Sequence, residues 1–404
     1  MTTSLLQHTQ SISGFQYHST EYQGNKIIFS ISQNRKKLFC TACGSFDVTP
    51  TFIKTRDIRG LKTGLKHTVL RVDIHRLRCH HCSAFRQEKL HFCPGPKSRC
   101  SNALRRTVIE LRSKMSIKDL ADYLDLPWAT VKYLEKKHLR MKYKKIPLKD
   151  AEVIGIDEIH TGRKSKYLTI VRDLKSGAVL HVGYGKGEKG LKGFARRLKS
   201  AGTQILCAAV DMAAGYTAWL KKHFPWTKIV YDHFHVIKLM NDKVTDIRRT
   251  IMREVEDTLG RQLKNTRWIL VKNNDNLSEK DRMKLKEIKS TFEDLNTAVN
   301  LRDCLREIYK QAQYSDHAEA AFEFWCSLAD ASGISQLKTM AKTIRSKIKG
   351  ITAYWDWDGL TNAAMEGFNN KIRWRIRQAY GYRDREYFRL KIFDLPETKT
   401  EKEI

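Results

Sequence analysis

The sequence predicts an α/β protein in which a mixed sheet carries a helical insertion and follows two small N-terminal modules. Three observations support this class. Strand patterns begin near residue 150, a long stretch of helical periodicity follows them, and two CxxC motifs stand near the N-terminus.

The composition indicates a polyanionic partner. The 404 residues can bury a core and hold several domains. Lysine and arginine number 75 against 44 acidic residues, a formal net charge of +31. Such an excess favours nucleic acid, because basic side chains neutralise phosphates and release counterions.

An anionic membrane surface is the main rival partner. However, no apolar run reaches the roughly 18 residues of a spanning helix, and residues 1–30 lack the basic-then-apolar pattern of a signal peptide. We therefore expect a cytoplasmic, nucleoid-associated protein.

The cysteine spacing predicts a structural zinc site. In a reducing compartment, nine cysteines are more consistent with metal ligands or small buried side chains than with disulfides. The motifs "CTAC" and "CHHC" are joined by residues that read as short strands, and two such motifs complete a closed tetrahedral Zn²⁺ site. The expected ligands, in a segment at about 38–85, are Cys40, Cys43, Cys79 and Cys82.

Two alternatives to that ligand set stay open. The four cysteines could be unrelated free thiols, or His80 or His81 could replace one of them. Cys93 and Cys100 fall outside the spacing, and we expect them to bind nothing.

Residues 101–142 read as three helices with helix-turn-helix spacing. Ser116 is expected to cap the second helix and Pro127 to start the third. In a helix-turn-helix domain the last helix lies in the major groove. The residues expected to approach bases are Thr130, Lys132 and Tyr133, and those expected to approach phosphates are Lys136 and Lys137. The turn lacks a glycine, and any three-helix packing unit gives a similar pattern, so packing alone is the alternative.

The pattern after a basic linker predicts the sheet. "EVIGIDEI", "KYLTIVRDL" and "GAVLHVGYG" read as three strands of an antiparallel meander. A helix, the strand "TQILCAAVD", another helix and the strand "KIVYDH" follow. This order implies a mixed sheet with helices on its faces, as in the ribonuclease H-like fold. Almost only helical periodicity follows at about 236–354, which predicts an all-helical insertion.

Two acids stand where they could act on a ligand. Asp157 lies inside the first strand of the meander, where a lone buried carboxylate is costly unless it is paired, protonated or bound to metal. Asp211 ends the fourth strand. Either acid alone could be a turn former. Since the first and fourth strands are expected side by side, both carboxylates open onto one edge of the sheet.

The stretch "TNAAMEGFNNKIRWRIRQAYGYRD" predicts an amphipathic helix with one acid among basic residues. Met365, Phe368 and Ile372 belong to its apolar stripe, and Glu366 and Asn369 to its polar face. A surface ion pair is the simpler explanation of Glu366, but positions 369 and 370 are asparagines and offer no charged partner. We expect this helix to bring Glu366 to the two aspartates. The neighbouring basic residues Lys371, Arg373 and Arg377 would then hold a phosphate backbone.

Taken in order, these motifs resemble a known family. "GIDE", "AVDM", "YDHFHV" and "TNAAMEGFNNKI", after a four-cysteine segment and a helix-turn-helix, are similar to the DDE transposases of bacterial insertion sequences, specifically the ISL3 family. The resemblance covers nearly the whole chain. It implies Asp157, Asp211 and Glu366 as catalytic ligands of a two-metal Mg²⁺ site. It also implies cleavage and strand transfer at the inverted repeats of the element.

Residues close to the three acids in the sequence have expected roles as well. Asp232 and His235, in "DHFH", are similar to an element of related transposases and would support the site, although a strand-end Asp and a core-facing His are the simpler interpretation. Glu158 should face the opposite side of its strand and take no part in catalysis. Trp355 and Trp357 could stack on a flipped or single-stranded base near the cleavage point, with packing as the alternative.

The expected domain order follows from these parts. It is an N-terminal region 1–100, a helix-turn-helix 101–142, a catalytic domain 150–395 with its insertion at about 236–354, and a polar tail 396–404. We expect a homodimer or higher assembly on double-stranded DNA, because two element ends must meet. The alternatives are a DNA-binding regulator with a degenerate catalytic domain, and a nuclease or resolvase without strand transfer.

Overall fold

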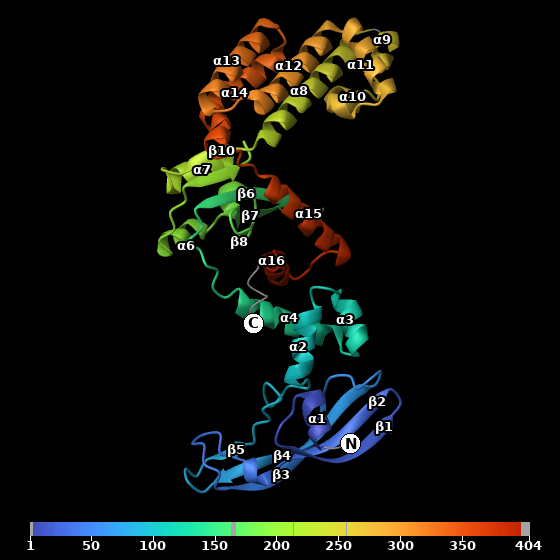
Figure 1. Cartoon of the computed structure of the whole chain (residues 1–404), viewed down its shortest axis with the longest axis vertical. Helices are drawn as coiled ribbons and strands as arrows, with labels where there is room; N and C mark the ends of the chain where they lie inside the picture. The colour runs from blue at the N-terminus through green and yellow to red at the C-terminus, as the bar shows by residue number, and fades with distance from the viewer. Residues whose placement is uncertain (1–2, 163–166, 213, 256, 397–404) are drawn as a thin grey trace. The chain divides into compact units, whose positions relative to one another are not determined.

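The computed structural model describes residues 3–162, 167–212, 214–255 and 257–396. The chain divides into two compact units, Met1–Lys144 and Lys145–Ile404, coloured from blue through cyan and from green to red in Figure 1. Among the described residues, no helix combines the length and apolar character needed to cross a bilayer. The predicted tail lies, apart from Pro396, outside the described residues.

The first unit begins with a five-stranded sheet. Its elements are α1 (Thr3–Gln10), β1 (Phe15–Gln23), β2 (Lys26–Gln33), the 3-10 turn η1 (Arg35–Lys37), β3 (Val48–Arg59), β4 (His67–Cys79) and β5 (Phe85–Gln87). The strand order is β1-β2-β4-β3, with β5 added to β4. Apolar residues on alternate positions of β2 and β4, among them Phe29, Leu70 and Ile74, form its core with Leu6 of α1.

Strands β3 and β4 differ from the expected short strands. They span 12 and 13 residues and form a long antiparallel ribbon. Strand β3 begins shortly after the first CxxC motif and β4 ends at the second, and Val48 pairs with Cys79, so the ribbon brings the two motifs together at one end. The local pattern did not predict this length because β3 is exposed on most of its residues and lacks a clear apolar alternation.

Three helices complete the first unit: α2 (Asn102–Leu111), α3 (Ile117–Leu124) and α4 (Trp128–Lys142). Ser101 and Ser116 cap the first two, since each hydroxyl accepts a hydrogen bond from a backbone N–H three residues on. Pro127 is the N-cap of α4 rather than its first helical residue. Asp125 takes the left-handed conformation (φ 50°) in the turn, which lacks a glycine, and Arg59 Nη2 lies 2.9 Å from its Oδ2.

The second unit is built on a mixed sheet with the order β10-β9-β6-β7-β8. Its strands are β6 (Val153–His160), β7 (Tyr167–Asp173), β8 (Val179–Tyr184), β9 (Cys207–Val210) and β10 (Lys228–Tyr231). Strands β6, β7 and β8 pair antiparallel, whereas β9 pairs parallel with both β6 and β10. The predicted pairing of the first and fourth strands is confirmed. Short helices α5 (Gly187–Gly190), α6 (Phe194–Ser200) and α7 (Ala214–His223) connect the strands.

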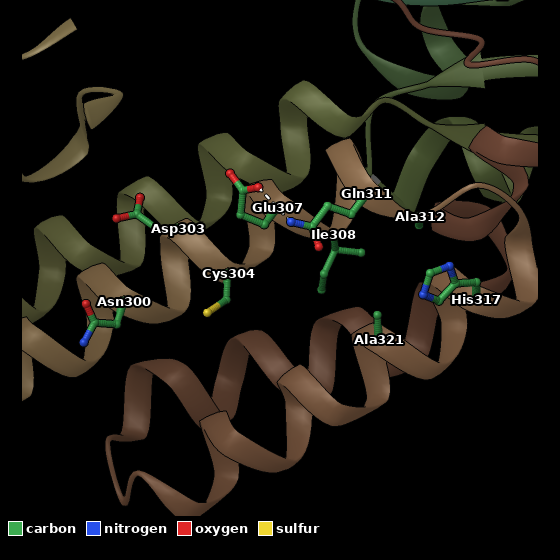
Figure 2. Close-up of a pocket in the computed structure, with 9 residues that line it drawn as sticks. All are labelled: Asn300, Asp303, Cys304, Glu307, Ile308, Gln311, Ala312, His317 and Ala321. Carbon is green, nitrogen blue, oxygen red and sulfur yellow. Dashed lines mark hydrogen bonds between the residues drawn. The ribbon is translucent and has the colours of Figure 1, made fainter. Parts of the chain in front are cut away.

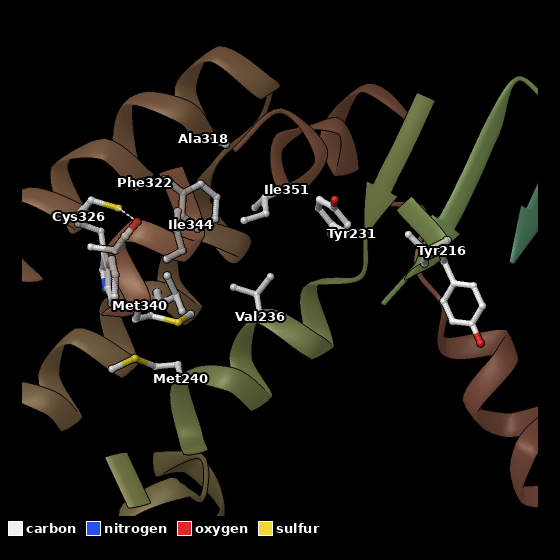
Figure 3. Close-up of a cluster of buried hydrophobic side chains, with 14 of the residues drawn as sticks. Tyr216, Tyr231, Val236, Met240, Ala318, Phe322, Cys326, Met340, Ile344 and Ile351 are labelled. Atoms are coloured by element: carbon white, nitrogen blue, oxygen red, sulfur yellow. Dashed lines mark hydrogen bonds between the residues drawn. The ribbon is translucent and has the colours of Figure 1, made fainter. Parts of the chain in front are cut away.

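A helical part follows β10 directly. It comprises α8 (His233–Glu254), α9 (Asp257–Gln262), α10 (Arg267–Val271), η2 (Asn274–Asn276), α11 (Glu279–Thr291), α12 (Glu293–Gln311), α13 (Ser315–Ala331) and α14 (Ser335–Asp356). One apolar cluster runs from the sheet into these helices, from Tyr216 and Tyr231 to Phe322 and Met340 (Figure 3). Helix α14 returns close to β10, where a Cβ at Gly350 would meet the Tyr231 ring at 2.5 Å.

Two last helices return to the sheet. They are α15 (Ala363–Gln378) and α16 (Arg385–Phe393). Helix α15 packs on β6 and α16 packs on β8. The Tyr184 hydroxyl of β8 donates a hydrogen bond to the Arg385 carbonyl at 2.7 Å, which fixes the start of α16.

Candidate active site

Asp157 and Asp211 occupy equivalent positions on neighbouring strands. Ile156 of β6 pairs with Val210 of β9 in the parallel register, so the next residue of each strand is one of the two aspartates. Both therefore emerge at the same edge of the sheet, as the sequence predicts. Asp211 is partly exposed, with a side chain 38% accessible.

The Asp157 carboxylate is held from two sides. Its Oδ1 accepts a hydrogen bond from the Glu158 backbone N–H at 2.7 Å, and its Oδ2 accepts one from Asn369 Nδ2 of α15 at 2.6 Å. Burial raises the pKa of Asp157 and the charge of Asp211 adds to this, while the Glu158 N–H, His235 and Asn369 act in the opposite direction. A buried carboxylate of this kind gains from a nearby positive charge.

His235 and Lys347 lie close to Asp211. His235 Nδ1 lies 3.4 Å from Asp211 Oδ1. Lys347 of α14 donates a hydrogen bond to the carbonyl of Met212. Burial lowers the pKa of this lysine, and the charge of Asp211 counteracts that effect. The helical part thus contributes a side chain to this edge of the sheet, which the sequence pattern did not indicate.

Asp232 acts as the N-cap of α8. Its carboxylate accepts a hydrogen bond from the Phe234 N–H at 3.1 Å and is 4% exposed. This cap fixes the first turn of the helix, which carries His235. The two residues of "DHFH" therefore have different positions: His235 faces Asp211, and Asp232 holds the helix that supplies it.

Glu158 contacts other elements than Asp157 does. The Tyr216 hydroxyl of α7 donates to its Oε2 at 3.4 Å, and Lys186 Nζ lies 3.5 Å from its Oε1. Asp157, one residue earlier, contacts α15. The alternation of a regular strand accounts for this difference.

Helix α15 docks on β6 through close contacts near its start. Asn362 Nδ2 donates to the Ile156 carbonyl at 3.4 Å, and a Cβ at Gly155 would meet Asn362 and Met365 side-chain atoms at 2.9 Å. Arg172 of β7 donates to the Ala364 carbonyl at 2.7 Å, and its guanidinium carbon lies 4.3 Å from the Phe368 ring centroid. The first half of α15 is therefore fixed to the sheet.

Asn369 departs from the sequence prediction. It was placed on the polar face with Glu366, yet it is 3% exposed because its amide reaches Asp157. Glu366 is exposed and lies one helical turn before Asn369. The helix thus brings Glu366 to the neighbourhood of Asp157 and leaves its carboxylate in solvent.

The three acids do not form a closed set of ligands. Among the described residues, the four cysteines are the only group of three or more His, Cys, Asp or Glu side chains whose ligand atoms all lie within 4.8 Å of one another. The carboxylates are still suitable ligands for Mg²⁺, which prefers carboxylate oxygens and keeps several waters. A cation could therefore be held by the aspartates at the sheet edge.

The cysteines have the geometry of a structural zinc site. Cys40 Sγ lies 3.6 Å from Cys82 Sγ, and Cys43 Sγ lies 3.6 Å from Cys79 Sγ. Tetrahedral Zn–S bonds of about 2.3 Å require sulfur separations of roughly 3.8 Å, so the donor set fits this metal. Backbone N–H groups of Cys43 and Ala42 lower the pKa of Cys40 to about 6, which favours the thiolate that binds metal.

The predicted DNA-contacting residues lie on two helices, one in each unit. On α4, Tyr133 is 61% exposed, Lys137 is exposed, and Thr130, Lys132 and Lys136 are partly exposed. On α15, three basic residues are exposed, Lys371, Arg373 and Arg377, and Arg373 Nη1 donates to Asn370 Oδ1 at 2.7 Å.

Trp355 and Trp357 take part in packing within the second unit. Trp355 Nε1 donates to the Ala312 carbonyl at 2.8 Å, and its ring stacks on Tyr309 with centroids 5.3 Å apart. Trp357 packs against the Val153 and Ala353 cluster. Both rings contribute to packing between the sheet and the helices, the alternative left open above.

A surface pocket in the helical part contains none of these site residues. It encloses about 480 Å³ between α12 and α13, and Figure 2 shows Cys304, Glu307 and His317 among the side chains around it. These side chains do not gather into a metal-type cluster within the described residues.

A mixed sheet that carries two acids on adjacent strands is consistent with a DNA-processing enzyme. Comparison with known proteins identifies the family. The model of a transposase family, the DDE type of ISL3 elements, matches residues 154–392. The chain is 30% identical over 393 residues to the transposase for insertion sequence element IS1001 of Bordetella parapertussis, covering 95% of this chain and 96% of that protein. The chain belongs to the ISL3 family of DDE transposases.

Two further similarities are weaker. The transposase for insertion sequence element IS1557 of Mycobacterium tuberculosis is 28% identical over 255 residues, which is 57% of this chain and 56% of that protein. The solved Drosophila P element transposase strand transfer complex aligns with a TM-score of 0.38 at 12% identity, covering 72% of this chain and 90% of that chain. At that score the likeness supports no structural argument.

Proposed function

We propose that this transposase binds the terminal inverted repeats of its own insertion sequence and catalyses Mg²⁺-dependent DNA strand cleavage and strand transfer. The observation that carries the proposal is the pairing of Ile156 with Val210, because Asp157 and Asp211 directly follow these two paired residues on adjacent strands. The strand order β10-β9-β6-β7-β8, with three antiparallel strands followed by two parallel ones, supports a ribonuclease H-like classification of the catalytic unit.

Each residue has a separate role in this mechanism. Asp157 is oriented by Asn369 and the Glu158 N–H, and Asp211 is oriented by His235. Glu366 swings from solvent toward these aspartates to complete the ligand set. When bound, a pair of Mg²⁺ ions activates the attacking oxygen and stabilises the leaving oxygen of an in-line displacement.

The first unit would recognise the element ends. We propose that α3 and α4 form the helix-turn-helix, with α4 in the major groove, and that Cys40, Cys43, Cys79 and Cys82 hold a structural Zn²⁺. Lys136 and Lys137 would contact phosphates there, and Lys371, Arg373 and Arg377 would do so near the acids. Two copies assembled on the DNA would bring the two ends together.

A cleavage assay tests the proposal. A supercoiled plasmid carrying the element ends is incubated with purified protein, with and without Mg²⁺. Substitutions Asp157→Asn, Asp211→Asn and Glu366→Gln are each expected to abolish cleavage while end binding in a gel-shift assay stays nearly intact. Glu158→Gln, next to Asp157 but turned to other partners, is the matched control and should still cut.

Other outcomes would support other functions. Binding of the ends with no Mg²⁺-dependent cutting by the wild-type chain would support a DNA-binding regulator instead. Cut ends without joined products would support a nuclease or resolvase. Equal loss of binding in all three acid variants would contradict their assignment as catalytic ligands.

A further inference from the structure

The second half of α15 differs from the first half because the sheet does not cover it. Met365, Phe368, Asn369 and Ile372 are buried, whereas no residue of the described stretch from Arg373 to Gly381 is buried. In Figure 1 this end of α15 extends away from the sheet strands of its own unit. A helix segment without a buried face gains little stability from its own chain, so its residues require another explanation.

This segment is strongly basic and carries an exposed aromatic side chain. Six basic residues and one acid stand between positions 371 and 385. The acid, Asp384, accepts a hydrogen bond from the Tyr387 N–H at 3.0 Å and caps α16. Trp374 lies among the basic residues with 57% of its surface exposed, and the guanidinium carbon of Arg375 lies 5.2 Å from its ring centroid.

Tyr380 is held in an unfavourable backbone conformation at the end of the helix. The Tyr380 N–H donates to the Arg377 carbonyl at 3.1 Å, and the Gly381 N–H donates to the Ile376 carbonyl at 2.9 Å. These two bonds form a Schellman motif, in which glycine usually occupies the left-handed position. Here that position is Tyr380, with φ 50°, although Gly381 follows directly.

The conformation of Tyr380 is fixed by anchors on both sides. The first half of α15 is bound to β6, and after the turn Tyr382 stacks on Phe388 of α16 with centroids 4.6 Å apart. Between these anchors the Tyr380 side chain is fully exposed. Strained backbone of this kind is concentrated at functional sites, and here it presents a large aromatic ring to solvent.

We propose that Trp374 and Tyr380 form a stacking surface for an unpaired DNA strand near the cleavage site. This inference deepens the proposed function and rests on it. The basic residues around the rings complement a phosphate backbone, while an aromatic ring needs an exposed base face, which intact duplex does not offer at its surface.

The position of the rings suits such a strand. Trp374 follows Glu366 by eight residues, which is about 12 Å along the helix axis. A strand that leaves the acids along α15 therefore reaches Trp374 within a few nucleotides and Tyr380 a little further on. Arg373 and Arg377 lie on the same stretch of helix and would contact its phosphates.

Binding of short DNA probes tests the surface without any cleavage step. Full-length protein is titrated, in buffer without added Mg²⁺, against a fluorescein-labelled single strand of twelve thymidines and against a duplex of the same length. Trp374→Ala and Tyr380→Gly should each weaken binding of the single strand by roughly 5- to 100-fold, the range for one lost base stack. Binding of the duplex should change by less than about twofold.

Tyr380→Gly separates binding from folding. Because glycine suits the left-handed position, this variant should melt at the same temperature as the wild type or higher, even as it binds the single strand more weakly. Tyr380→Phe keeps a ring and should bind as the wild type does. Trp226→Ala removes a tryptophan of the same 57% exposure, on the α7–β10 connection, and is the matched control.

A photocrosslink locates the contact directly. A single strand with one 5-iododeoxyuridine should crosslink to Trp374 or Tyr380, identified by peptide mass spectrometry. Unchanged single-strand affinity in both variants, equal losses on duplex and single strand, or crosslinks only elsewhere would each overturn the inference. If Trp374 and Tyr380 bind the single strand but the wild-type protein never cuts DNA, the result contradicts the proposed cleavage activity and still supports the stacking surface.

Discussion

Replacement of Asn369 should separate DNA cleavage from DNA binding. In Asn369→Ala, Asp157 Oδ2 loses the amide donor 2.6 Å away. Asn369 is 3% exposed, so little water can take the place of that amide at once. We expect Asp157 to lose its fixed orientation and α15 to lose one of its contacts with β6.

The size of the effect follows from the kind of bond. A hydrogen bond to a charged group contributes about 1.5–3 kcal/mol. If that energy is used to orient the ligand, its loss slows cleavage roughly 10- to 150-fold. Mutation of a group that orients a metal ligand typically lowers metal affinity or activity by about 10- to 100-fold, which agrees with this range.

The assay measures cleavage at saturating end DNA over a Mg²⁺ titration. The rate should fall and the half-saturating Mg²⁺ concentration should rise, while gel-shift affinity for the ends stays within about twofold of wild type. Hydrogen exchange in α15, measured without Mg²⁺, should become faster. Asn369→Asp should be worse than alanine because it places a second carboxylate against Asp157.

Asn370 provides the control. It is the next residue on the same helix, is exposed, and accepts its hydrogen bond from Arg373. Asn370→Ala should leave the Mg²⁺ dependence unchanged. If Asn369→Ala kept the wild-type cleavage rate, Mg²⁺ dependence and hydrogen exchange in α15, Asn369 would not be the residue that orients Asp157.

Two further predictions concern stability. Removal of zinc with a chelator should increase hydrogen exchange in residues 40–82 near the CxxC motifs and weaken end recognition, while the second unit keeps its melting temperature; joint melting of both units would contradict this. His181 is buried: its Nε2 donates a hydrogen bond to the Gly190 carbonyl at 2.9 Å, and its Nδ1 lies 3.4 Å from Arg197 Nη1. Burial lowers the pKa of His181 from the usual 6.5 to about 4, and the positive charge of Arg197 acts in the same direction. The unfolded chain therefore binds more protons between these values, so stability falls as the pH drops from 6.5 toward 4, by about 2 kcal/mol between pH 7 and pH 5. His181→Leu should remove that share of the pH dependence in urea unfolding, and an unchanged slope would rule it out.

The sequence predicted what depends on local pattern and on strand order. The sequence predicted the meander, the parallel strand before Asp211 and the pair of CxxC motifs. Strand patterns and cysteine spacing are local features, so they can be recognised from the sequence. Asn369 was not readable as a buried residue, since its partner Asp157 lies 212 positions earlier in the chain. Lys347 was missed for the same reason: its contact with Met212 spans 135 positions.

Two other features depend on packing and backbone conformation. Trp355 stacks on Tyr309, a residue of another helix that no local pattern connects with it. The turn before α4 lacks a glycine, and Asp125 adopts the left-handed conformation there with Arg59 bound to its carboxylate. Tertiary partners decided both outcomes.

The apolar cluster shared by the sheet and the helical part has a consequence for the evolution and engineering of this transposase. Because Tyr231 of β10 packs against Gly350 of α14, and the same cluster continues to Phe322, the residues between the second and third acids cannot be exchanged as an independent cassette. Deleting them would strip the outer strand of its cover and expose apolar surface to aggregation.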